Sequence, residues 1–110
     1  LWVMMYEVKV SKQAGDDLRG IFEYIAFELQ APENASGQLQ RLEEHILNLN
    51  TMPNRYPKYR KEPWKSRGIH VLLVDNYVIF YITGDEPKVV TILRVMYTGR
   101  DIGEQLDSET

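Results

Sequence analysis

The chain has 110 residues, 44% of them hydrophobic and 26% charged, a composition typical of one folded domain covering residues 1–110. It has no cysteine and only two histidines, which excludes disulfides, and neither a metal nor a cofactor is expected. The formal net charge of −3 argues against a protein that binds nucleic acid over its whole surface.

No segment has the roughly 18 consecutive apolar residues that a membrane span requires. Residues 1–5 are apolar, but this stretch is too short for a signal peptide and lacks a basic start. We therefore expect a cytoplasmic protein without membrane contact. Because the chain begins with Leu1, Met4 and Met5 are candidates for its natural start.

The first fifty residues predict one strand and two helices. Residues 2–10 have a period of two, and in the later half apolar Tyr6, Val8 and Val10 alternate with Glu7 and Lys9, which is typical of a half-buried strand. Ser11 is a candidate helix cap, with Asp16 and Asp17 expected in the first turns. The first helix then has an apolar stripe: Ala14, Leu18, Ile21, Phe22, Ile25 and Leu29.

Pro32 suits the first turn of a second helix, where its missing N–H costs nothing. The apolar residues of this helix repeat at intervals of four and three, which predicts a packing seam: Ala35, Leu39, Leu42, Ile46 and Leu49. Because only Ala31 and Pro32 separate the two helices, we expect an antiparallel helical hairpin.

Three prolines exclude regular helix from residues 51–66. Residues 55–70 carry six basic side chains and one acidic one, although the whole chain is acidic. This loop is therefore a candidate contact for phosphates or for an acidic partner; a solvated loop held to the core by its aromatics is the alternative. The candidate target-binding residues here are Lys58, Arg60, Lys61, Trp64, Lys65, Arg67 and His70.

Three strands are predicted after the loop, at residues 69–74, 77–83 and 88–97, with Asp75 and Asn76 forming a tight turn. Alternation along the last strand places Val89, Thr91, Leu93 and Val95 on one face, and Val90, Ile92, Arg94 and Met96 on the other. An arginine in so apolar a strand must pair with a carboxylate or point into a binding groove.

Tyr97 and Arg100 flank Gly99 just past the last strand. Tyrosine can transfer a proton and arginine can clamp a phosphate, so both are candidate site residues. The sequence has no nucleophile elbow, no glycine-rich phosphate loop and no paired catalytic carboxylates.

The order strand, helix, helix, three strands, together with Tyr77-Val78-Ile79-Phe80-Tyr81 and Tyr97-Thr98-Gly99-Arg100-Asp101, resembles the RelE/ParE superfamily of toxins from type II toxin–antitoxin systems. The resemblance extends from about Tyr6 to Arg100. It implies an α+β fold in which a helical hairpin packs on one face of a small, mainly antiparallel sheet, leaving the other face or the rim for binding.

The resemblance implies two targets. ParE-like toxins inhibit DNA gyrase, and RelE-like toxins cut mRNA on the ribosome with cations on the sheet and a terminal Tyr or His. The acidic net charge, and Val78 and Phe80 in place of cations, favour the ParE-like function. In the ribonuclease alternative, Arg94 and Tyr97 would be catalytic, with Arg67 and Arg100 stabilising the phosphorane.

The expected partner is a cognate antitoxin, as in modules that stabilise plasmids, and a homodimer is left open. The third alternative is a non-toxic binding module on the same scaffold. Whether the protein is an enzyme depends on which of these targets applies.

Overall fold

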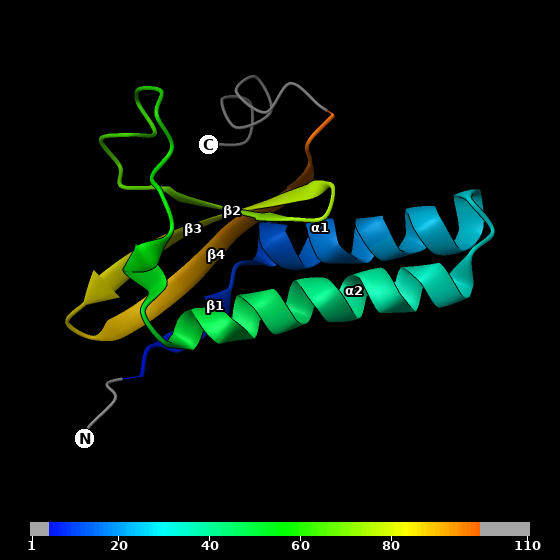
Figure 1. Cartoon of the computed structure of the whole chain (residues 1–110), viewed down its shortest axis with the longest axis horizontal. Coiled ribbons are helices and arrows are strands. Elements are labelled where there is room, and N and C mark those ends of the chain that lie inside the picture. Colours follow the sequence, from blue (N-terminus) through cyan, green and yellow to red (C-terminus); the bar gives the residue numbers. More distant parts are fainter. Residues whose placement is uncertain (1–4, 100–110) are drawn as a thin grey trace.

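The protein is described here from a computed structural model, which places residues 5–99. It has an α+β fold in which two helices pack on a four-stranded mixed sheet, as the sequence predicted (Figure 1). The elements, in chain order, are β1 (Glu7–Val10), α1 (Lys12–Glu23), a π-helical turn (Tyr24–Glu28), α2 (Pro32–Leu47), two 3-10 turns (Asn48–Asn50 and Pro53–Arg55), β2 (His70–Val74), β3 (Tyr77–Asp85) and β4 (Lys88–Tyr97).

The strands follow the order β1-β4-β3-β2 across the sheet. The last three form the predicted antiparallel meander, and Asp75 has a positive φ of 54° in the tight turn between β2 and β3. Strand β1 pairs parallel with β4, from Glu7 opposite Val89 to Val10 opposite Ile92, a pairing that spacing alone left undecided. Beyond Ile92, helix α1 rather than a strand lies along this edge of β4.

Ser11 caps α1 as predicted, since its hydroxyl accepts a hydrogen bond from the backbone N–H of Ala14 at 3.0 Å. Asp16 and Asp17 lie in the second turn of α1, because the helix begins at Lys12, and its first turn has no acidic residue. The π-helical turn shifts the side chains that follow it. Leu29 is therefore 56% exposed, and the predicted apolar stripe does not continue to that residue.

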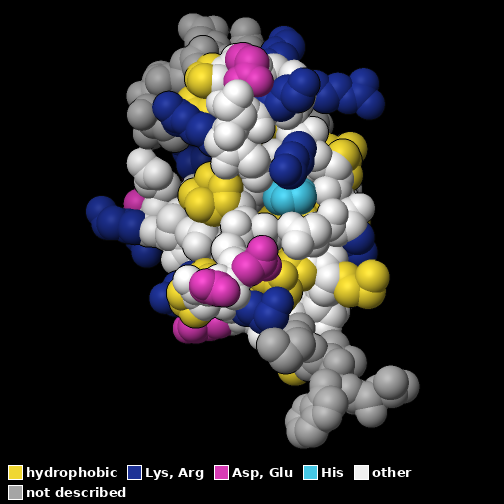
Figure 2. Space-filling view, turned by 90° about the vertical axis from the view of Figure 1, so that its left-hand side faces the viewer, with side chains coloured by type: hydrophobic (Ala, Val, Ile, Leu, Met, Phe, Trp, Pro, Cys, Tyr) yellow, Lys and Arg dark blue, Asp and Glu magenta, His cyan; other side chains and the backbone are white. Residues whose placement is uncertain are grey.

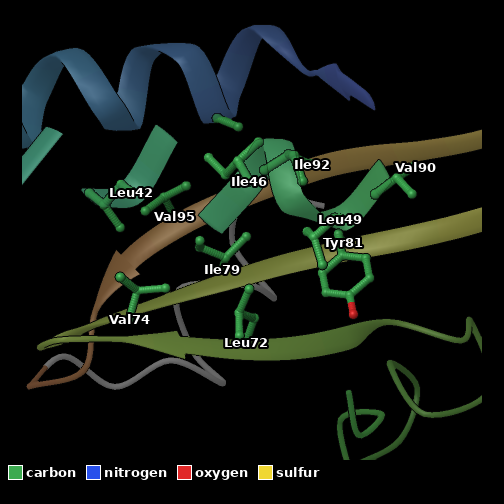
Figure 3. Close-up of a cluster of buried hydrophobic side chains, with 11 residues drawn as sticks. Leu42, Ile46, Leu49, Leu72, Val74, Ile79, Tyr81, Val90, Ile92 and Val95 are labelled. Carbon is green, nitrogen blue, oxygen red and sulfur yellow. The ribbon is translucent and has the colours of Figure 1, made fainter. Parts of the chain in front are cut away.

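The hairpin buries its seam against one face of the sheet, where aliphatic side chains from α2 meet those of the central strands (Figure 3). The buried members of this first core are Ala14, Leu42, Ile46, Leu49, Leu72, Val74, Ile79, Tyr81, Val90, Ile92 and Val95. A second, smaller core lies on the other side: Trp64, Ile69, Val78, Phe80 and Met96. Of the two surfaces expected to be left for binding, the other face and the rim, this face is largely covered, because the loop before β2 folds onto it.

Strict alternation along β4 is also wrong. The pairing of β3 with β4 shifts between Phe80 and Tyr81, which lie opposite Arg94 and Ile92, so Leu93 is the extra residue of a β-bulge. The bulge brings Val95 into the first core beside Val90 and Ile92, and places Leu93 against the second. Arg94 follows the extra residue directly, and its side chain reaches Asp17 of α1.

Among residues 5–99, no helix is long and apolar enough to cross a membrane.

Candidate functional site

Residues 55–69, called the basic loop below, are held against the sheet by aromatic anchors and backbone hydrogen bonds. The indole of Trp64 is buried, and the ring of Tyr59 meets Phe80 edge-on at 5.8 Å. The N–H of Tyr59 donates to the carbonyl of Ile69 at 2.7 Å, and residues 57–59 thereby pair with the start of β2. The loop therefore has a fixed shape.

All six cations of the basic loop are exposed: Arg55, Lys58, Arg60, Lys61, Lys65 and Arg67. None forms an ion pair with another residue of the described chain 5–99. Two guanidinium groups lie over aromatic rings, Arg55 over Tyr56 at 5.0 Å and Arg67 over Trp64 at 4.8 Å. Figure 2 shows Lys and Arg side chains gathered over the upper part of the face, where this loop lies.

Two of the predicted target contacts, the aromatic side chains of Trp64 and His70, lie inside the protein. Trp64 is 4% exposed and supports the second core. His70 is also 4% exposed; its Nδ1 lies 2.9 Å from the carbonyl oxygen of Tyr56, and its ring stacks on Tyr81 at 5.1 Å. Their placement favours structural roles, and of the predicted loop contacts only the cations reach the surface.

Arg94 is a buried member of an ion pair, the first of the two outcomes that the sequence allowed. Its Nε and Nη2 donate to the two carboxylate oxygens of Asp17 at 2.8 and 2.9 Å. Asp17 Oδ2 also accepts from the backbone N–H of Val95 at 2.9 Å. One carboxylate on α1 therefore binds both the guanidinium of Arg94 and the backbone N–H of Val95 in β4.

A groove of about 860 Å³ lies beside this ion pair, between the helical hairpin and the end of the sheet. It is lined by both members of the pair and by apolar and aromatic residues, including Tyr24, Leu29 and Tyr77. Tyr97 lies here as well, 49% exposed. Burial raises the pKa of the Tyr77 phenol, and the neighbouring Tyr97 raises it further, so Tyr77 is a neutral phenol at physiological pH.

The predicted site residues therefore divide between two surfaces. Arg94 and Tyr97 line the groove, and none of the six loop cations, all within the described residues, is among its lining residues. Arg100 lies outside the described residues. Arg67 and Arg94, which the ribonuclease alternative would use together, contact different parts of the fold: Arg67 lies over Trp64 of the second core, and Arg94 binds Asp17 of α1.

Sequence reasoning missed Asp17 as the partner of Arg94 and missed the helical side of the groove. Asp17 is 77 residues from Arg94, and no spacing signal connects them. A usable signal for this side was Tyr24, an aromatic residue outside the predicted apolar stripe. Leu29 gave none, because it fits the stripe and is exposed only after the π-helical turn.

The fold, two helices on a four-stranded mixed sheet with an aromatic cluster at the end of β4, is that of the RelE/ParE class of toxins. The model of the ParE toxin of the type II toxin–antitoxin system parDE matches residues 8–102, so the chain belongs to the ParE toxin family. No curated protein matches the sequence.

Two solved structures have the same fold. The chromosomal ParDE toxin–antitoxin system from P. aeruginosa superposes with a TM-score of 0.71 at 22% identity, covering 86% of this chain and 97% of that one. The toxin–antitoxin complex RelBE2 from Mycobacterium tuberculosis gives a TM-score of 0.61 at 24% identity, covering 86% and 92%. At these identities the likeness establishes the fold.

Proposed function

We propose that this protein is the toxin of a toxin–antitoxin pair and that it inhibits DNA gyrase by binding, without catalysing a reaction. Membership of the ParE toxin family supports the toxin role. The observation that carries the choice of target is the state of Arg94. A ribonuclease would need this cation to face the phosphate, and here it is held by both oxygens of Asp17.

The rest of the sheet supports the same choice. Strands β2 and β3 contain no lysine or arginine, and β4 has only Lys88, at its far end, besides Arg94. Stabilising the charge of a phosphoryl transition state needs cations aimed at the reacting group. Both faces of the sheet carry packed cores, which leaves little of the central strands for a catalytic surface.

The antitoxin partner is proposed to dock in the groove. Its apolar and aromatic lining suits the apolar side of an amphipathic segment, and a polar group on that segment can reach the Asp17–Arg94 pair. Both similar structures are of toxin–antitoxin systems, which supports a partner of this kind.

The test compares two reactions with the purified protein. In a supercoiling assay with DNA gyrase and ATP, we expect loss of supercoiling or accumulation of cleaved DNA, and addition of the antitoxin should abolish the effect. With ribosomes and mRNA we expect no cleavage. Cleavage of mRNA without any effect on gyrase would reject the proposal.

A ribonuclease remains the second candidate because Tyr97 is half exposed in the same groove as Arg94. A phenol at this position could assist proton transfer at a 2′-hydroxyl. The third candidate, a non-toxic binding module, predicts normal growth when the soluble protein is induced without antitoxin, whereas both toxin hypotheses predict growth arrest.

A further inference from the structure

The cations of the basic loop form no ion pair within residues 5–99, and only Arg55 and Arg67 contact aromatic rings of the loop itself. Residues 55–70 hold six of the 13 lysines and arginines of the chain but one of its 16 acidic residues. That one, Glu62, accepts hydrogen bonds from the backbone and hydroxyl of Ser66 inside the loop. The loop therefore presents a strongly positive surface on an otherwise acidic protein.

The positive surface is also preorganised. Trp64, Tyr59 and the backbone bonds to the start of β2 fix the loop, so the cations cannot disperse as they would on a mobile segment. Holding like charges together opposes folding, and a bound anion removes that repulsion. A rigid array of lysines and arginines is suited to an extended ligand with several negative charges.

We infer that the basic loop binds the sugar–phosphate backbone of a nucleic acid. Phosphate oxygens match the donors of arginine, which binds them in a bidentate manner, and the charge of lysine. The indole of Trp64 is buried, so it cannot stack on a base. We therefore expect phosphate contacts that do not depend on sequence.

An acidic segment of the antitoxin is the competing ligand, and the geometry disfavours it. The groove proposed for the antitoxin lies between the hairpin and the end of β4, whereas the basic loop covers the other face of the sheet. In Figure 1 the loop stands at the opposite end of the molecule from the turn between α1 and α2. A partner seated in the groove leaves the loop cations accessible.

This inference deepens the proposed function and rests on it in one respect: the nucleic acid would be the duplex DNA on which gyrase works, which a bound toxin could also contact. Binding itself is measured on the toxin alone. A toxin that binds nucleic acid but does not affect gyrase would overturn the proposed function and leave this inference standing. A toxin that inhibits gyrase but binds no nucleic acid would support the proposed function and overturn this inference.

The experiment measures fluorescence anisotropy of a mixed-sequence DNA duplex and of a single-stranded RNA over a range of KCl concentrations. The loop variant carries Arg60→Glu, Lys61→Glu and Lys65→Glu. The matched control carries Lys9→Glu, Lys12→Glu and Arg19→Glu, which makes the same change in net charge at exposed positions outside the loop. Circular dichroism checks folding, and Arg60→Gln, Lys61→Gln and Lys65→Gln serve if charge reversal unfolds the protein.

We expect the loop variant to bind at least about 30-fold more weakly at low salt, and the slope of log affinity against log salt to fall by roughly two to three units. The control should lose much less. Preference for duplex DNA or for RNA identifies the source of the phosphates, and either preference supports the site. Equal losses in both variants, or no binding by the parent protein, would overturn it. So would unchanged nucleic-acid binding by the loop variant combined with loss of antitoxin binding.

Discussion

The carboxylate of Asp17 on α1 holds the guanidinium of Arg94 on β4 through two hydrogen bonds of 2.8 and 2.9 Å. The same carboxylate accepts from the N–H of Val95 at 2.9 Å, so it ties the first helix to the strand at its bulge. The side chains are 9% and 16% exposed for Arg94 and Asp17. An enclosed charge pair with two parallel hydrogen bonds therefore joins the hairpin to the sheet.

Replacing Asp17 by Ala should destabilise the fold by about 3 kcal/mol, because the buried arginine loses its carboxylate and the N–H of Val95 loses its acceptor. Urea denaturation measures this change. The double variant Asp17→Leu with Arg94→Met should be less destabilised than Asp17→Ala, since it removes both charges together.

The control is the ion pair between Arg41 and Asp75, whose N–O distance is also 2.8 Å but whose side chains are 52% and 44% exposed. Solvent screens this pair, so Arg41→Ala should leave the urea midpoint nearly unchanged. Equal losses from Asp17→Ala and Arg41→Ala would contradict the structural role given to Asp17.

Trp64→Ala should destabilise the protein by about 3–5 kcal/mol, because the indole fills the second core rather than contacting a ligand. Thermal denaturation followed by circular dichroism measures the loss. Arg60→Ala, on the exposed surface of the same loop, should change stability little. A stable Trp64→Ala protein that loses only target binding would refute this assignment.

Periodicity was sufficient to predict the helical hairpin and the meander. Ala35, Leu42 and Ile46 of α2 are buried as their spacing requires, and so is Leu49 in the 3-10 turn that follows. Periodicity failed wherever the backbone changes its repeat. The π-helical turn exposes Leu29, and the extra residue Leu93 in β4 moves Val95 to the other face.

The site was harder to predict than the fold. The charge of the basic loop is visible in the sequence, but the burial of Trp64 is not, because a tryptophan beside prolines and lysines fits an exposed loop equally well. The Asp17–Arg94 pair and the groove join segments that are far apart in the chain, and local patterns carry no information on such pairs.

Tyr97→Phe distinguishes the two proposed targets. It removes only a hydroxyl from an exposed ring that packs edge-on against Tyr77, with centroids 5.9 Å apart. Inhibition of gyrase by a bound protein should change less than about threefold, whereas a ribonuclease that uses this phenol in proton transfer should slow by about 100-fold or more. Supercoiling and ribosomal cleavage assays on the same preparation measure both.

Leu29→Asp should weaken antitoxin binding without unfolding the toxin, because this side chain lines the groove yet is 56% exposed. Truncating or charging a central apolar contact often costs more than tenfold in affinity. Phe27→Asp is the matched control, since Phe27 is 70% exposed on the same turn but does not line the groove. Calorimetric titration with the cognate antitoxin measures both, and equal losses would remove the groove as the docking site.

The pH dependence of Asp75 tests the contact between α2 and the β2–β3 turn. Hydrogen bonds from Arg41, and then from Gln38, hold the pKa of the Asp75 carboxyl below its ordinary value of 3.8. Because the folded pKa is the lower one, the stabilisation is present above the unfolded pKa and is lost as pH falls through the folded pKa. Titration of the carboxyl by NMR should give a value below 3.8, and Arg41→Ala should raise it toward that value. An unchanged pKa in Arg41→Ala would mean that the pair does not form in solution.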